Sequence, residues 1–207
     1  MNTPTTRDHI IQAADDLFYR QGFERTSFSD IAAAVKISRG NFYHHFKTKD
    51  DILDAVISLR LRNTQQMLQR WETDDDNPQN RIRMFIHMLI MNRAKIMHYG
   101  CPVGTLCGEL AKLDHAAQGN ANRIMMLFRD WLARQFAQAG RRADADTLAM
   151  HLLVLAQGVA TMASAMRDEA FIRREVDSMD TWLDAQCRPR RHRPTRASHA
   201  PQRKGNS

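Results

Sequence analysis

Apolar residues recur along most of the chain at the three- and four-residue spacing of an amphipathic helix. The first such stripe consists of Ile10, Ile11, Ala14, Leu17 and Phe18. Thr5 and Asp8 precede it in the pattern of a helix cap. We find no strand-like alternation of useful length and no internal repeat. The pattern therefore predicts an all-α chain of about nine helices.

The segment from Thr26 to Leu53 reads as two short helices joined by a tight turn, followed by the start of a third helix. Ser27 with Asp30 and Thr48 with Asp51 match the capping-box pattern, and Ser38 is a further N-cap. The positions that a compact helix-turn-helix must bury are Phe28, Ile31, Ala32, Val35, Ile37, Phe42 and Phe46. Between Val35 and Asp50 there are four basic residues and no acidic one. A presented helix with this polar and basic edge suits the major groove of DNA.

This segment resembles the DNA-binding domain of the TetR (tetracycline-repressor-like) family of bacterial regulators. The residues in the family's register are Ile31, Ala32, Val35, Lys36, Ile37, Ser38, Gly40, Tyr43, His45, Phe46, Lys49 and Leu53. The preceding helix fits as well, through Ala13, Ala14, Leu17, Phe18, Gly22, Phe23 and Thr26. One departure is Lys36, which stands where the family usually has Gly; a non-Gly residue in a left-handed turn costs ~1 kcal/mol or more. The resemblance implies three helices in an N-terminal helix-turn-helix DNA-binding domain and about six in a C-terminal regulatory and dimerisation domain.

The motif register assigns DNA contacts to individual residues. We expect Tyr43, His45 and Lys49 to bind phosphates, with Thr26 at the edge of the site. We expect Arg39, Asn41 and His44 to approach base edges. The predicted DNA-binding residues are therefore Thr26, Ser38, Arg39, Gly40, Asn41, Tyr43, His44, His45 and Lys49. Double-stranded DNA carrying a palindromic operator is the predicted partner.

Residues that typically begin or end helices divide the rest of the chain. A long helix is predicted from Lys49 to about Arg70, and Asn77-Pro78 opens another to about Tyr99. Gly100 ends that helix and Pro102 begins the next, to about Lys112. Further helices fit 115–138, 144–167 and 170–186. The predicted domains are 1–48 for DNA binding, 49–187 for effector binding and dimerisation, and 188–207 as a disordered basic tail.

The last two helices carry broad apolar surfaces and small residues between them. The small residues are Ala156, Gly158, Ala160 and Ala163. An ordinary monomer core would explain this pattern, but the resemblance favours a homodimer that pairs through these two helices. A two-fold dimer also doubles the length of DNA that one short recognition helix can read.

The middle helices are rich in methionine, a flexible side chain that can line an adaptable ligand pocket or simply fill a core. The resemblance assigns this domain to effector binding. The predicted effector contacts are Met84, His87, Met88, Met91, His98, Cys101, Met125, Phe128 and Trp131, and Arg93 is a further plausible polar contact. No cofactor and no metal is predicted, because His98 and Cys101 have no third ligand at a convincing spacing. His44 and His45 fit phosphate contact better than metal binding.

Cys101 follows Gly100 and precedes Pro102, which predicts that it is the N-cap of a helix. Backbone amides and the positive helix end favour a thiolate at such a position. The Gly-Cys start also resembles TetR-type regulators that sense electrophiles or oxidants. Two interpretations stay open here: Cys101 is a redox or electrophile sensor, or it is a small buried residue beside the effector pocket.

The net charge of +7 comes from one end of the chain. Residues 1–60 hold eight Lys/Arg and eight Asp/Glu, residues 61–187 hold fifteen of each, and residues 188–207 hold seven basic residues and no acidic one. The tail either attracts phosphates without sequence preference or solubilises the terminus. No apolar run is expected to approach the ~20 residues of a membrane span, and no secretory stretch is evident. Together with three cysteines, this predicts a cytoplasmic protein.

Two other functional classes compete with a DNA-binding regulator. An enzyme would need Cys101 or Cys107 as nucleophile with His98 or His115 as base, but no phosphate loop, carboxylate pair or metal signature accompanies them. A helical adaptor or RNA-binding protein with a basic tail would leave the register of residues 26–53 unexplained. The sequence favours a homodimeric repressor released by a small-molecule effector, with modification of Cys101 as one route of release; activation stays open.

Overall fold

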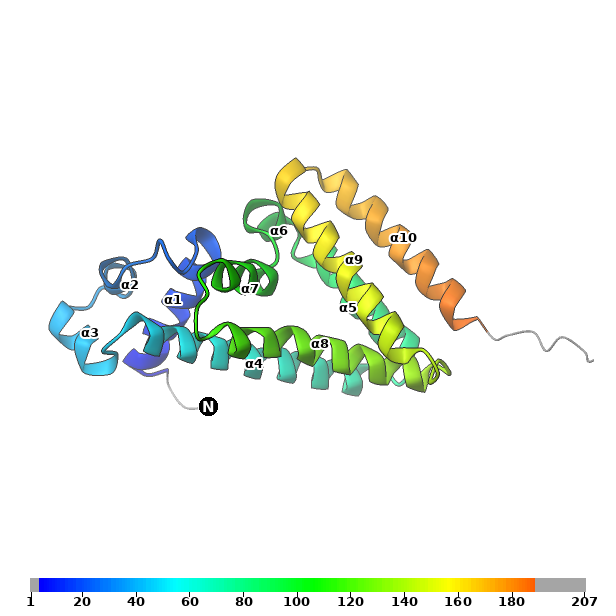
Figure 1. The fold of residues 1–207 in the computed structure, drawn as a ribbon, viewed down its shortest axis with the longest axis horizontal. Coiled ribbons are helices and arrows are strands. Elements are labelled where there is room, and N and C mark those ends of the chain that lie inside the picture. Colours follow the sequence, from blue (N-terminus) through cyan, green and yellow to red (C-terminus); the bar gives the residue numbers. More distant parts are fainter. Residues whose placement is uncertain (1–3, 189–207) are drawn as a thin grey trace, which may run out of the picture.

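The computed structural model describes residues 4–188, and every regular element in that range is a helix (Figure 1). The helices are α1 Thr6–Gln21, α2 Phe28–Val35, α3 Arg39–His45, α4 Lys49–Asp74, α5 Pro78–Met91, α6 Arg93–Tyr99, α7 Pro102–Lys112, α8 Gln118–Gln138, α9 Ala145–Met166 and α10 Glu169–Cys187. The all-α prediction is confirmed. One predicted helix is split, because Asn92 separates α5 from α6. Its side-chain amide and its backbone amide both donate to the Met88 carbonyl, at 2.9 and 3.0 Å.

The predicted caps of α1, α2 and α4 are confirmed, whereas α8 begins at Gln118 and not at residue 115. Thr5, Ser27 and Thr48 each form a capping box with the aspartate three residues on. Backbone and hydroxyl hydrogen bonds in these boxes hold the pKa of each aspartate below its usual value. At the turn between α2 and α3, Lys36 adopts the left-handed conformation with φ 58° and ψ 42°. The position that the resemblance flags as unusual for lysine therefore does carry backbone strain.

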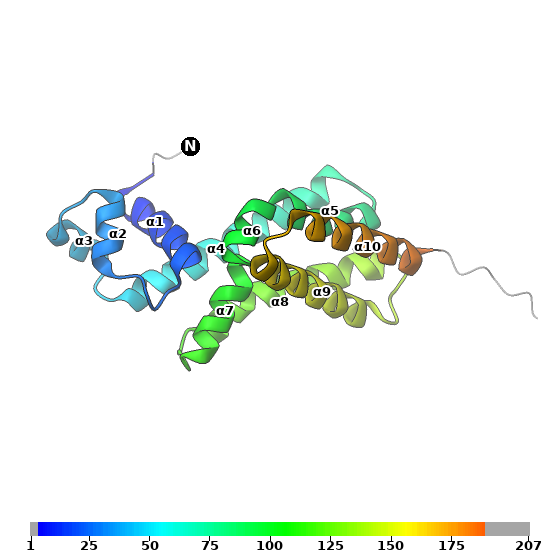
Figure 2. The same ribbon diagram turned by 90° about the horizontal axis from the view of Figure 1, so that it is seen from above.

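The first three helices and the start of α4 enclose one apolar core. Its fully buried members include Ile10, Ala14, Ile31, Phe42, Ile52 and Leu53. α4 then continues away from this core and packs along α8, while α9 and α10 cross above them (Figures 1 and 2). Because the first turns of α4 pack on α1, the division at residue 48 stays a prediction. Of the predicted basic tail, only Arg188 lies within the described residues.

α9 is the most apolar helix of the second domain. By length and composition alone it could cross a membrane, which corrects our expectation that no apolar run approaches that length. In the structure α9 packs against α6, α8 and α10 and buries nine of its residues. These contacts identify α9 as a core helix of the bundle.

Candidate DNA-binding surface and ligand cavity

α3 is a short helix held by one cap and by two aromatic contacts to Phe28. Ser38 caps it by accepting from the Asn41 amide at 3.3 Å. Phe42 is buried and its ring centroid lies 5.2 Å from that of Phe28. The opposite side of α3 faces outward, where Tyr43 is 46% exposed and its ring leans on Phe28 at 5.5 Å. Gly40, Asn41 and His44 are exposed, His45 is half-buried, and Arg39 begins the helix.

Two predicted DNA contacts are engaged inside the protein. Thr26 is 1% exposed, and its hydroxyl donates to the Gly22 carbonyl at 2.6 Å. The Lys49 ammonium donates to the carbonyls of Phe23 and Glu24 at 3.1 and 3.2 Å and lies 4.3 Å from the Phe23 ring centroid. These contacts brace the turn between α1 and α2, so the DNA roles of Thr26 and Lys49 stay predictions.

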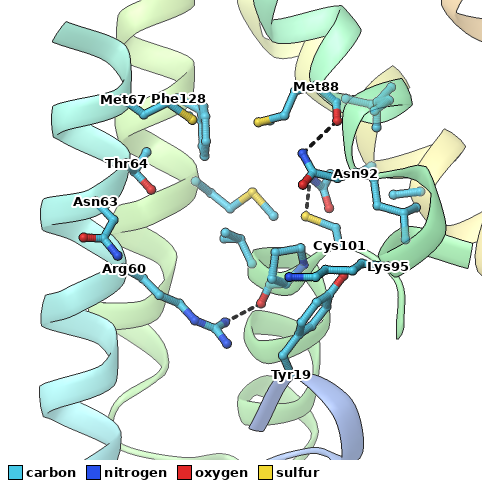
Figure 3. A pocket seen from close by; sticks show the side chains of 18 of the residues that line it. Tyr19, Arg60, Asn63, Thr64, Met67, Met88, Asn92, Lys95, Cys101 and Phe128 are labelled. Atoms are coloured by element: carbon cyan, nitrogen blue, oxygen red, sulfur yellow. Dashed lines mark hydrogen bonds between the residues drawn. The ribbon is translucent and has the colours of Figure 1, made fainter. Parts of the chain in front are cut away.

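A cavity of about 350 Å³ lies between α1, α4 and the helices of the second domain (Figure 3). It brings together four of the predicted effector contacts, Met88, Cys101, Met125 and Phe128. The other five do not line it. Met84 is half-buried elsewhere, Met91 is 79% exposed, and Trp131 is buried against Trp71. The two histidines are bonded to other groups: His87 to Asp180 at 2.6 Å, and the His98 ring to the Ala94 carbonyl.

Sequence reasoning did not identify the cavity residues contributed by α1 and α4. They are Gln12, Asp15, Asp16, Tyr19, Arg60, Asn63, Thr64 and Met67. Arg60 is 8% exposed, and its Nε donates to Asp15 Oδ1 at 2.6 Å while its guanidinium also donates to the Pro102 carbonyl. This one side chain thus joins α1, α4 and α7. No local pattern marks the pair, because Arg60 and Asp15 are 45 residues apart.

Cys101 occupies the predicted N-cap of α7. Its sulfur accepts from the Gly104 amide and from Gln157 Nε2, each at 3.4 Å. Beside it, the Tyr19 hydroxyl donates to the Gly100 carbonyl at 2.8 Å. Burial, followed by the nearby Cys101, raises the pKa of Tyr19 to about 12. Burial also raises the pKa of the Cys107 thiol. Cys101 therefore lies at the wall of the cavity and next to α1.

The C-terminal half of α7 is hydrogen-bonded to the turn between α1 and α2. The Glu109 carboxylate accepts from the amides of Phe23 and Glu24, each at 2.9 Å. Gly22 has φ 92°, and a Cβ there would lie 2.9 Å from a Glu109 oxygen. The His115 ring adds an edge contact to Phe23 at 5.2 Å between centroids. The DNA-binding helices are thus tied to the second domain through α7 as well as through α4.

The side chains of residues 4–188 offer no group of three or more His, Cys, Asp or Glu placed to hold a metal ion. The cavity lining instead combines apolar side chains with amides, two hydroxyls and charged groups. This chemistry suits reversible binding of an organic molecule.

Comparison with known sequences matches both parts of the chain to family models. Residues 10–56 match the model described as bacterial regulatory proteins, tetR family. Residues 78–177 match the C-terminal domain described as transcriptional regulator LmrA/YxaF-like. Together the two matches span the helix-turn-helix and most of the helical bundle.

Individual relatives agree with these matches. An HTH-type regulator in the lacX 3′ region of Lactococcus lactis is 31% identical over 55% of this chain, which spans 59% of that relative's length. The regulator TtgR of Pseudomonas putida is 24% identical over 86% of this chain and 90% of its own.

Solved structures share the fold. A TetR transcriptional regulator from Legionella pneumophila superposes with a TM-score of 0.78 at 23% identity, covering 88% of this chain and 99% of its own. A TetR-family regulator from Agrobacterium tumefaciens gives 0.75 at 21% identity, over 86% and 96% of the two chains.

Proposed function

Because the chain belongs to the TetR family of bacterial transcriptional regulators, we propose that it is a cytoplasmic homodimeric repressor. In this proposal α3 of each subunit reads one half of a palindromic operator. A small molecule bound in the cavity releases the DNA. Repression follows from a compact dimer that occupies a promoter and excludes polymerase.

One observation carries the effector part of the proposal. The cavity is lined by Asp15 and Tyr19 of α1 together with Phe128 of α8. A ligand there touches the DNA-binding helices and the bundle at the same time. It can therefore bind one relative arrangement of the two better than another, which is the condition for shifting a conformational equilibrium.

The surface of α9 supports the homodimer. Its exposed apolar side chains are Met150, Val154, Met162 and Met166, and Val154 is 60% exposed. A Cβ added at Gly158 would meet nothing within 4 Å, so another helix can approach closely there. α10 lies beside α9 (Figure 2). Exposed apolar stripes of this kind mark association surfaces, and a second copy of α9 and α10 would cover this one.

Cys101 could also bind an effector covalently. Its thiolate can add to the electron-poor carbon of an α,β-unsaturated carbonyl, forming a sulfur–carbon bond while the proton lost by the thiol ends on the α-carbon. The adduct would then occupy the cavity beside Tyr19. Replacement by serine separates this role from simple packing, because Cys101→Ser should resist release by such reagents and still fold.

The repressor proposal is tested by selecting duplexes from a random DNA library and measuring their affinity by fluorescence anisotropy. We expect enrichment of one palindrome. Asn41→Ala should relax preference at particular base pairs. Tyr43→Ala and Lys49→Ala should weaken binding to all sequences, and Lys49→Ala should lower the salt slope by about one unit.

Lys49 also contacts the carbonyls of Phe23 and Glu24, so thermal unfolding of each variant checks that the loss of DNA binding is not a loss of folding. Enrichment of no sequence would contradict the proposal. So would folded Tyr43→Ala and Lys49→Ala proteins that hold the operator as tightly as the wild type.

A further inference from the structure

We infer that the effector is an amphipathic anion, with an apolar body and a carboxylate or similar head that binds at Lys95. The inference rests on the proposed function only in taking the cavity to be the effector site. It adds the charge and the orientation of the ligand.

The cavity has an apolar end formed by α5, α8 and α9. The side chains there are Phe85, Met88, Leu89, Met125, Phe128 and Leu153, joined by Met67 of α4. The rings of Phe85 and Phe128 pack against each other with centroids 5.6 Å apart. The methionines can adapt to the ligand's shape. Figure 3 shows Met67, Met88 and Phe128 together at this end. The body of the ligand belongs here, because this end offers almost only carbon and sulfur.

The rest of the cavity lining is more polar and is open to solvent. It includes Gln12, Asn63, Thr64 and Lys95, of which Thr64 is half-buried and the other three are exposed. Within residues 4–188 the side chains of these four make no hydrogen bond or ion pair with another residue. In Figure 3 the Lys95 side chain extends from α6 across the cavity toward the wall that carries Arg60. These groups supply hydrogen-bond donors and one positive charge that the protein itself does not use.

The charges of the lining favour an anion over a cation. Asp15 is paired with Arg60 at 2.6 Å, and Asp16 is paired with Arg20 at 3.0 Å. Both carboxylates are therefore neutralised, whereas Lys95 faces no carboxylate partner. A ligand anion would complete a charge pair at the solvent-exposed side of the cavity, where Lys95 lies. A ligand cation would meet an uncompensated ammonium there.

The head of such a ligand would lie at the junction with the DNA-binding helices. Lys95, Arg60 and Tyr19 surround the same end of the cavity (Figure 3). A carboxylate bound at Lys95 competes with Asp15 for the Arg60 guanidinium. Weakening the Arg60–Asp15 pair loosens the hold of α4 on α1. The charge of the ligand thereby connects occupancy of the cavity to the position of the DNA-binding helices.

Isothermal titration calorimetry on the full chain, without DNA, tests the inference with three decyl compounds. Decanoate, 1-decanol and decylammonium share one apolar body and differ in head charge. We expect the wild type to bind decanoate about tenfold more tightly than 1-decanol, and decylammonium most weakly. Lys95→Met should bind decanoate and 1-decanol with equal affinity. Lys112→Met, at an exposed lysine outside this cavity, is the matched control and should behave as the wild type.

Each other outcome overturns the inference. Equal binding of decanoate and 1-decanol by the wild type would show that the cavity does not select charge. Binding of none of the three would contradict the inference that this cavity takes up an amphipathic anion. An unchanged preference in Lys95→Met would place the head elsewhere. Because operator DNA is absent from these titrations, failure of the repressor proposal would appear only in the DNA selection.

Discussion

Replacing Glu109 by alanine should release the turn between α1 and α2 from the second domain. In the wild type the two carboxylate oxygens accept one amide each, from Phe23 and Glu24, both at 2.9 Å. The same turn is held from the other side by Lys49, whose ammonium bonds its carbonyls. Glu109→Ala therefore removes the bonds to the amides and leaves the bonds to the carbonyls in place.

The geometry sets the size of the effect. A hydrogen bond to a charged group contributes about 1.5–3 kcal/mol. The Phe23 bond is part-buried and the Glu24 bond is exposed, so water replaces much of the second one. We expect Glu109→Ala to cost about 2 kcal/mol in the free energy of opening this turn. In Glu109→Gln one of the two backbone amides faces the side-chain NH₂ of glutamine instead of an oxygen. The free energy of opening the turn should therefore fall by about half as much as in Glu109→Ala, or by more.

Hydrogen exchange followed by NMR measures the opening directly. The Phe23 and Glu24 amides should exchange about 30-fold faster in Glu109→Ala than in the wild type, the factor that corresponds to about 2 kcal/mol. Glu24→Ala is the matched control, because it removes a glutamate side chain from the same turn and keeps the backbone amide. Unchanged exchange at both amides in Glu109→Ala, or equally fast exchange in Glu24→Ala, would refute the assignment.

Three further perturbations address the dimer, the thiols and the tail. Val154→Glu places a charge in the exposed apolar stripe of α9, so this variant should sediment as a monomer in sedimentation velocity. Gln66→Glu, at an exposed position of α4, is the control and should stay dimeric. A dimeric Val154→Glu protein would reject the α9 interface. Because burial raises the pKa of Cys107 and Cys187, a maleimide at pH 7 should label Cys101 first. Labelling of Cys107 should increase as the pH rises. Peptide mass spectrometry that finds Cys107 labelled before Cys101 would contradict this order. Removing residues 188–207 deletes seven basic side chains and should lower DNA affinity at low salt without changing base preference; loss of operator recognition at moderate salt would show that the tail sets specificity.

The features that were predictable from the sequence are those whose physics is local. Each capping box lies within four residues, so the patterns at Thr5, Ser27 and Thr48 are sufficient to predict the helix starts. The same holds for Cys101, where Gly100 and Pro102 fix the helix boundary on either side. The break at Asn92 was not predicted, because Asn is an ordinary helix residue unless its side chain turns back to the backbone.

The cavity depends on which helix faces which, and periodicity alone does not decide that. The methionine pattern predicts an adaptable apolar region, and Met88, Met125 and Phe128 do meet there. Trp131 belongs to the same helix as Phe128 but turns toward Trp71 of α4. The polar end of the cavity could not be predicted, because α1 reads as part of a DNA-binding domain and contributes Asp15 and Tyr19 only once α4 and α6 are placed beside it.

The two ends of α7 explain why one short helix matters to both parts of the protein. Cys101, Pro102 and Val103 at its start line the cavity, and Glu109 two turns later holds the α1–α2 turn. A helix of eight residues between these points is about 12 Å long and nearly incompressible along its axis. A ligand that shifts the start of α7 must therefore either carry Glu109 with it or bend the helix. Because the Glu109 carboxylate accepts from the amides of Phe23 and Glu24, a shift that Glu109 follows would move the turn that precedes α2 and the recognition helix.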